Sequence, residues 1–242
     1  MKIGICQINP TVGAINKNKQ LILEYYDRSV TLGAELVVFP ELALTGYPPQ
    51  DLLLREQFLT KTANAFDEIA KRTSTPMILG SILVDNNNLF NCSFLCENGN
   101  VVGYYKKILL PTYDVFDEDR YFKSGSESSV LELNISGQTK RIGLQICEDL
   151  WDHNYSKDLV KSIKETGADI IINISASPFG DDKLIERSKL IKAKAQKTNL
   201  PFVYCNMVGS QDELIFDGQS LVYDKDGNLI AKGKAFEEDL LI

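Results

Sequence analysis

Short apolar runs rich in valine, isoleucine, phenylalanine and tyrosine recur along the whole chain, and they constrain its fold more than any other feature. β-Branched and aromatic residues in short runs are typical of buried strands. Segments with apolar residues three or four apart lie between some of these runs and predict helices with one buried face, near 21–29, 58–69 and 184–195. The predicted strands are 2–8, 35–39, 77–84, 89–96, 101–105, 130–135, 141–146, 169–174, 202–206 and 219–223.

The order of these elements predicts an α/β fold in a single domain. The stretch 76–146 is almost all strand, with hairpin turns at 85–88 and 97–100, and helices lie on both flanks. This pattern favours two packed sheets covered by helices. No linker, repeat or low-complexity tract divides residues 1–242. A turn at 224–228 precedes what looks like the start of another strand at 238–242, so we expect a piece of a longer protein.

Charge and hydropathy exclude several kinds of partner. The formal net charge is -7, and lysine and arginine do not gather on one segment, which argues against nucleic acid and anionic membranes. A small-molecule substrate is the better expectation. No apolar run approaches the ~18 residues of a membrane span, and the first residues lack a signal-peptide pattern, so we predict a cytoplasmic location.

Cysteine and histidine usage restricts the chemistry. Five cysteines are an odd number and predict free thiols in a reducing compartment. His153 is the only histidine, which excludes zinc sites built on several histidines, and no metal site is expected. A catalytic triad would have to use His153, but it lies in a polar stretch where a histidine is usually solvated.

Three segments place one reactive side chain at the end of a predicted strand, where functional groups commonly meet. Glu41 supplies a carboxylate, Lys107 an ammonium and Cys147 a thiol. Each has an ordinary structural explanation when taken alone, but two acids and a tryptophan close behind Cys147 indicate a strand exit and not mid-core. A thiol with an ordinary pKa of about 8.5 needs a base and a nearby cation to react at neutral pH.

The order of these three residues within FPELALTGYPPQDLL, YYKKILLPTYDVFDEDRYF and LQICEDLW resembles the nitrilase, or carbon-nitrogen hydrolase, superfamily. More narrowly, the chain is similar to the glutaminase domains of glutamine-dependent NAD synthetases. Four further segments carry this narrower likeness, and with the first three they cover nearly the whole chain: 46–52, 113–122, 175–179 and 209–218. The resemblance implies a four-layer αββα sandwich.

The resemblance also implies roles for individual residues. Glu41 would be the general base, Lys107 would support the oxyanion and Cys147 would be the nucleophile. Glu148 would help to hold the α-ammonium of the substrate, and Glu118 would orient Lys107. Three other positions match those that bind glutamine in such domains: Tyr113, Ser177 and Lys183.

The function that the resemblance implies is release of ammonia from L-glutamine, which would supply the amidation of deamido-NAD. The glutaminase step would need no cofactor. ATP, Mg and deamido-NAD would bind only to a C-terminal synthetase domain, which this chain lacks, since it has no glycine-rich phosphate loop. The synthetase domain is the expected partner, in a homo-oligomer, with neither nucleic acid nor membrane involved.

Two other functions stay open. A free-standing amidase of the same superfamily would share the catalytic set and act on another small amide; the substrate-binding matches favour the glutaminase. A non-catalytic binding module would keep the fold without turnover, and the intact Glu-Lys-Cys set argues against it.

Overall fold

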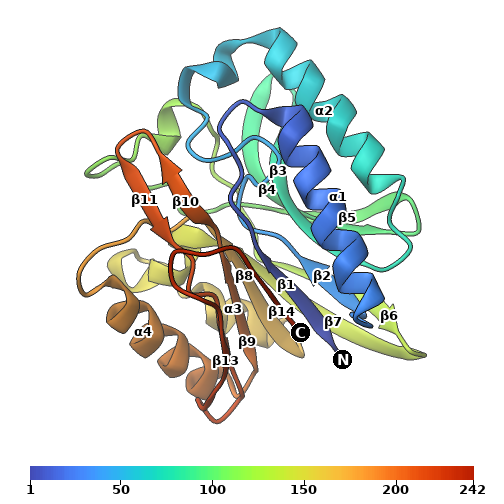
Figure 1. Ribbon diagram of the computed structural model, residues 1–242. Helices are drawn as coiled ribbons and strands as arrows, with labels where there is room; N and C mark the ends of the chain where they lie inside the picture. Colours follow the sequence, from blue (N-terminus) through green and yellow to red (C-terminus); the bar gives the residue numbers. More distant parts are fainter.

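Two six-stranded sheets lie face to face in the computed structural model, which describes residues Met1–Ile242 (Figure 1). The first sheet has the order β14 (Asp239–Leu241), β1 (Ile3–Gln7), β2 (Leu36–Val38), β3 (Met77–Asp85), β4 (Asn88–Glu97), β5 (Asn100–Lys106). The second has the order β13 (Leu229–Lys232), β12 (Leu221–Tyr223), β9 (Phe202–Asn206), β8 (Ile170–Ser175), β7 (Gln138–Ile146), β6 (Ser129–Ile135). A separate hairpin joins β10 (Val208–Gln211) to β11 (Leu214–Asp217).

Helices cover the outer face of each sheet, which completes the predicted four-layer αββα sandwich. Helices α1 (Ile15–Thr31) and α2 (Glu56–Ala70) pack on the first sheet, and α3 (Leu159–Glu165) and α4 (Lys183–Thr198) pack on the second. Three short 3₁₀ segments lie in the connections: η1 (Gln50–Leu54), η2 (Glu118–Arg120) and η3 (Cys147–Asn154). No helix is both long enough and apolar enough to cross a membrane.

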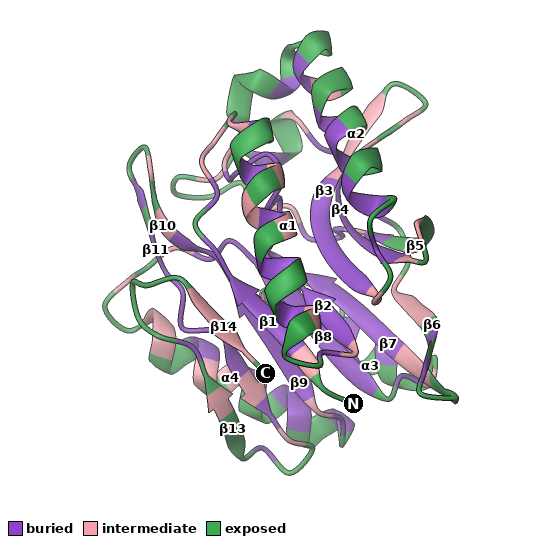
Figure 2. Cartoon of the chain, turned by 45° about the vertical axis from the view of Figure 1, so that its right-hand side comes forward, coloured by how far each residue is buried: buried purple, intermediate pink, exposed green.

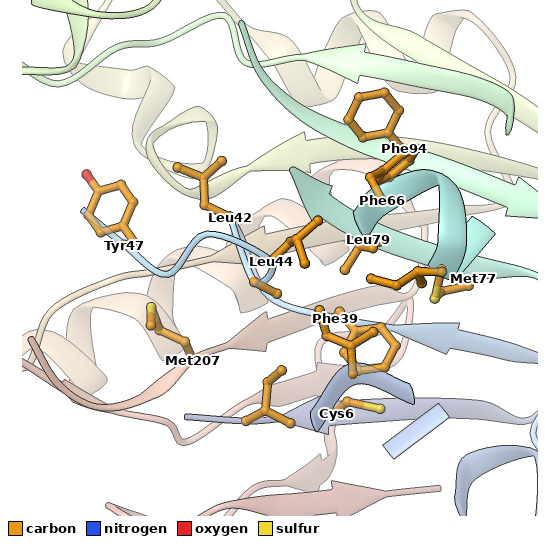
Figure 3. Packing of buried hydrophobic residues seen from close by; sticks show 14 of the residues in the cluster. Cys6, Phe39, Leu42, Leu44, Tyr47, Phe66, Met77, Leu79, Phe94 and Met207 are labelled. Carbon is orange, nitrogen blue, oxygen red and sulfur yellow. The ribbon is translucent and has the colours of Figure 1, made fainter. Parts of the chain in front are cut away.

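Side-chain alternation along the strands builds three separate cores. In β1, Ile5 points into the core between the two sheets, whereas its neighbour Cys6 joins the core under α1 and α2. Figure 2 shows that the central strands are buried, whereas the edge strands β5, β6 and β13 and the outer sides of the helices carry exposed residues. Figure 3 shows the core beneath α2, where Phe66 packs on Phe94 with ring centroids 4.6 Å apart. Strands with two buried faces explain the apolar runs of the sequence.

Strand direction brings several chain segments to one edge of the sandwich. Strands β1, β2 and β3 are parallel to one another, and β7, β8 and β9 form a second parallel set. Parallel strands present their carboxyl ends at the same edge of a sheet, and loops at that edge commonly form sites. Glu41 follows β2, Cys147 follows β7 and Ser177 follows β8.

The predicted elements are all present, with differences at their ends and in the short strands. The ten predicted strands and three predicted helices are confirmed, but α3, β10, β11 and β13 were not predicted. Strand β12 begins at Leu221 and not at Gln219, because Gln219 has a left-handed backbone with φ 52°. The stretch 107–128, which lies between the predicted strands 101–105 and 130–135, is a loop with one 3₁₀ turn, so 76–146 is less completely strand than expected.

Candidate active site

The three residues predicted to be catalytic converge at the shared edge of the two sheets. Lys107 Nζ donates to Glu41 Oε1 at 2.7 Å and to Glu118 Oε1 at 2.7 Å. All three side chains are almost fully buried, as is Cys147, whose thiol lies within the electrostatic range of each of them. We call Glu41, Lys107, Glu118 and Cys147 the buried cluster. The structure brings together the first, second and fourth of these, and their catalytic roles stay a prediction.

Glu41 is held by three donors. Asn91 Nδ2 donates to Oε1 at 2.7 Å, the same oxygen that accepts from Lys107, and the backbone N–H of Ala176 donates to Oε2 at 2.8 Å. The backbone of Glu41 also touches β3, where a Cβ on Gly80 would lie 2.4 Å from Pro40 O and 2.8 Å from Glu41 Cα. Position 80 therefore has to be glycine if the carboxylate is to stay where it is.

Glu118 gives the buried cluster a second carboxylate. Tyr47 OH donates to Glu118 Oε1 at 2.8 Å, and Oε2 has no hydrogen-bond partner. Burial raises the pKa of Glu118 to about 7, and the negative charge of Glu41 adds to this effect, while Lys107 opposes it. Two carboxylates therefore share one ammonium in a place from which water is excluded.

Cys147 lies at the first position of η3 in a conformation that non-glycine residues rarely adopt, with φ 42°. Such strain costs of order 1–3 kcal/mol and persists only where neighbouring groups impose it. Asp149 supplies those contacts: its Oδ2 accepts from Ile146 N at 2.9 Å, and its Oδ1 accepts from Leu109 N at 2.9 Å. Tyr105 OH also donates to Oδ2 at 2.8 Å. Asp149 thus ties the cysteine turn to the loop that follows Lys107.

The electrostatics of the buried cluster keep its thiol protonated at rest. Burial raises the pKa of Cys147 well above its ordinary value, and Glu41 raises it further, whereas Lys107 lowers it. Burial also works against the charge of Lys107, but Glu118 and Glu41 more than offset this and hold the pKa of Lys107 well above its usual value. The cluster therefore contains a neutral thiol, a fixed cation and a carboxylate that is placed to accept a proton.

Two of the three predicted substrate-binding residues line a cavity of about 640 Å³ that opens to solvent. Tyr113 OH donates to Glu148 Oε2 at 2.9 Å, and Tyr155 OH donates to Glu148 Oε1 at 2.9 Å. The ammonium of Lys183 lies 4.1 Å from the centroid of the Trp151 ring. We call the cavity lined by Tyr113, Trp151 and Lys183 the open pocket. Its lining includes the Tyr113 phenol and the Lys183 ammonium, which lies 3.7 Å from Glu186, and the buried Glu148 carboxylate that accepts from Tyr113 lies next to this lining.

Ser177, the third predicted substrate residue, is buried and does not line the open pocket. Asn206 holds its backbone on both sides, because Asn206 Oδ1 accepts from Ser177 N at 2.9 Å and Asn206 Nδ2 donates to Ser177 O at 3.3 Å. Asn206 Nδ2 also donates to Gly218 O at 3.0 Å. These contacts fix the backbone of Ser177 and do not involve its hydroxyl.

Several residues that shape the site were not singled out from the sequence. Asn91, Tyr47, Asp149 and Asn206 each contact a predicted site residue or the turn that carries one. A usable signal existed for Asn91, since it is a polar residue in the middle of an apolar strand. His153 is exposed and lies outside the buried cluster, as expected. All five cysteines are free and buried.

Comparison with known proteins gives the same family over the whole chain. The sequence profile of the carbon-nitrogen hydrolase family matches residues 2–242. The chain is 39% identical to a glutamine-dependent NAD(+) synthetase of Aquifex aeolicus, over 100% of this chain and 41% of that protein. It therefore spans about two fifths of the length of that relative.

Solved structures agree with the fold. A glutamine-dependent NAD+ synthetase from Acinetobacter baumannii, solved with adenosine diphosphate, superposes with a TM-score of 0.92 at 33% identity, covering 99% of this chain and 44% of that one. A nitrilase-superfamily amidase from Nesterenkonia AN1 superposes with a TM-score of 0.86 at 22% identity, covering 99% and 88%, which is a likeness of fold alone. The family match over residues 2–242, the αββα sandwich and the buried cluster agree, and the chain belongs to the carbon-nitrogen hydrolase family.

Proposed function

We propose that this chain is a glutaminase domain that releases ammonia from L-glutamine, with Cys147 as nucleophile, Glu41 as general base and Lys107 as oxyanion support. The observation that carries the proposal is the Lys107 ammonium fixed between Glu41 and Glu118 beside a buried thiol. Amide hydrolysis by a thiol needs a proton acceptor and a cation at this spacing.

The reaction follows from these positions. Cys147 Sγ attacks the side-chain carboxamide carbon, and Glu41 takes the thiol proton. The tetrahedral oxyanion receives hydrogen bonds from Lys107 and from the backbone N–H of Glu148; removal of one such donor typically costs about 3 kcal/mol of barrier. Glu41 then returns its proton to the departing nitrogen, and ammonia leaves. A water molecule, deprotonated by Glu41, hydrolyses the remaining thioester to glutamate.

The open pocket supports an amino acid as the substrate. Glu148 carries a negative charge for an α-ammonium group, and its two oxygens are oriented by Tyr113 and Tyr155. The ammonium of Lys183 makes no hydrogen bond and is therefore available to an α-carboxylate. The Ser177 hydroxyl is the third group assigned to glutamine. Opposite charges across one pocket are complementary to a zwitterionic head group.

The partner is proposed from the relatives. Glutamine-dependent NAD synthetases are more than twice as long as this chain, and the matched part covers 41% of the Aquifex aeolicus protein. We therefore assign residues 1–242 to one glutaminase domain whose ammonia goes to a synthetase domain, where ATP, Mg and deamido-NAD bind. The amide hydrolysis uses side chains alone. A homo-oligomer is also expected, and the free buried cysteines favour the cytoplasm.

The experiment is active-site labelling with a chloroketone analogue of glutamine, followed by peptide mass mapping. We expect one adduct, at Cys147, which excess glutamine suppresses. The variant Glu41→Gln keeps the size of the side chain and removes its basicity, so labelling should slow by about 10²–10⁴-fold. Cys205 is an internal control, because it is also buried, at 0% exposure against 8% for Cys147, but lies outside the cluster.

Two results would contradict the proposal. Equal labelling of Cys147 and Cys205 would mean that no thiol is activated. Labelling at Cys147 that glutamine leaves unchanged, while a small neutral amide suppresses it, would assign the chain to the free-standing amidases of the superfamily.

A further inference from the structure

The single tryptophan of the chain lies against a lysine whose other close partner is the carboxylate of Glu186. The Lys183 ammonium lies 4.1 Å from the centroid of the Trp151 ring, a distance typical of a cation–π contact. Its nearest carboxylate oxygen belongs to Glu186, at 3.7 Å, and no hydrogen bond joins the two. The indole face is therefore the main group that locates this charge.

Lys183 is an unfavourable residue for its position in the fold. It is the first residue of α4, where the helix dipole is positive and disfavours a cation. Its side chain is also 36% exposed, so without a specific contact its rotamers would be spread through solvent. A lysine held at such a place requires a compensating contact, and the Trp151 ring supplies it.

The ring is rigidly connected to the cysteine turn. Trp151 lies in η3, four residues after Cys147, at a point where the backbone leaves helical geometry with φ -94° and ψ 24°. The same segment is anchored before it by Asp149, through Ile146 N at 2.9 Å, and after it by Asp152, through Leu159 N at 2.9 Å. The thiol and the indole thus belong to one segment, η3, which side-chain hydrogen bonds anchor at both ends.

We propose that Trp151 is a positioning and specificity residue: it holds Lys183 over its ring so that the open pocket selects amides carrying a carboxylate over neutral amides. The inference rests on the proposed glutaminase function and deepens it. The ring occupies one side of the ammonium and leaves N–H donors for a carboxylate on the other side. Preorganisation of this kind lowers the entropy lost on binding.

The test compares two alkylating probes of Cys147 that differ in charge: the chloroketone analogue of glutamine, which carries a carboxylate, and chloroacetamide, which does not. In Trp151→Leu we expect the chloroketone rate at low concentration to fall about threefold to tenfold, with chloroacetamide unchanged. Trp151→Phe keeps an aromatic face, so its chloroketone rate should lie between those of the wild type and Trp151→Leu. Lys192→Met, an exposed lysine on the same helix, is the matched control and should leave both rates unchanged.

The outcomes separate this inference from the function on which it rests. Equal losses of rate with both probes would show that Trp151 has a merely structural role, and unchanged rates would show that it has no role. If glutamine still protects the wild type, either result overturns this inference and leaves the proposed function standing. A wild type that glutamine does not protect overturns both. In the Lys183→Met background, Trp151→Leu should not lower the chloroketone rate further. A double variant whose loss of rate equals the product of the two single losses would contradict the coupling of Trp151 to Lys183.

A second measurement does not depend on the stability of the Trp151 variants. Because Trp151 is the only tryptophan, the emission of the protein reports the surroundings of this one ring, which include Lys183 and His153. We expect Lys183→Met and saturating glutamine each to change the emission, and Lys192→Met to leave it unchanged. An identical spectrum for Lys183→Met and wild type would overturn the contact.

Discussion

Two lysines next to the cysteine turn are held in opposite ways. Lys107, in the buried cluster, is 1% exposed and donates to two carboxylates at 2.7 Å. Lys183, in the open pocket, is 36% exposed and rests on an aromatic ring without a hydrogen bond. The first is fixed by carboxylates from two separate segments, whereas the second lies between the Trp151 ring and the exposed carboxylate of Glu186.

The difference separates the chemistry from the choice of substrate. In the buried cluster, low dielectric makes each charge strongly dependent on its partners, so a single substitution disturbs both stability and reaction. In the open pocket, solvent screens the charges, so a substitution changes affinity with little effect on the fold. The same scaffold can thus keep its reaction while its substrate preference changes.

Lys107→Met should have the largest effect, because it leaves Glu41 and Glu118 buried without a cation. Removal of one partner from a buried ion pair typically costs 3–5 kcal/mol, so we expect a loss of about 4 kcal/mol in the free energy of unfolding. Urea titration followed by circular dichroism measures it, and labelling of Cys147 should also be lost. A loss below about 1 kcal/mol would mean that Glu41 and Glu118 are largely protonated in the folded protein and do not need the cation.

Gly80→Ala should have the next largest effect, although position 80 carries no functional group. The added Cβ would lie 2.4 Å from Pro40 O, so the Glu41 segment has to move. We expect about 1–3 kcal/mol of destabilisation, as for other overpacked positions, together with slower labelling of Cys147. Gly103→Ala is a useful contrast, since the atoms nearest to a Cβ there belong to the Leu131 side chain and not to the Glu41 segment. Unchanged labelling of Cys147 in Gly80→Ala would contradict the conclusion that the close contact at position 80 keeps Glu41 in place.

Glu118→Gln should change the pH dependence of stability. The pKa of Glu118 is raised from 4.5 to about 7, so between these values the folded protein holds a proton that the unfolded chain has lost. Wild-type stability therefore falls as pH rises through this window, by up to about 1.4 kcal/mol per pH unit. The variant cannot ionise and should show a flatter profile. Urea midpoints from pH 5 to 8 test this, and parallel profiles would contradict it.

Lys183→Met should have the smallest effect on the fold and sharpens the contrast with Lys107→Met, because the substitution is the same. We expect the free energy of unfolding to change by less than about 0.5 kcal/mol, as at other surface positions. The KM for glutamine should rise about tenfold with kcat nearly unchanged, because a uniform binding contact is lost. Steady-state ammonia release measures both constants. A fall in kcat alone would place Lys183 in the chemical step.

Prediction from the sequence succeeded where a signal is local and repeated. Long apolar runs marked the ten strands, whereas β10, β11 and β13 are four residues each and too short for alternation to stand out. The loop at 107–128 carries no predicted strand, and its sequence alone does not show where its side chains point. Its residue Glu118 nevertheless reaches the buried cluster.

The sequence by itself determined the layered α/β fold, since the apolar periodicity of strands and helices acts within a few residues. It also placed Glu41, Lys107 and Cys147 at strand ends. Only the tertiary structure decided which distant groups meet them: Asn91 on Glu41, Asp149 between two loops, and Trp151 beneath Lys183. These contacts join residues 32 to 50 positions apart or lie across a turn, and they depend on strand order and register, which no local pattern specifies.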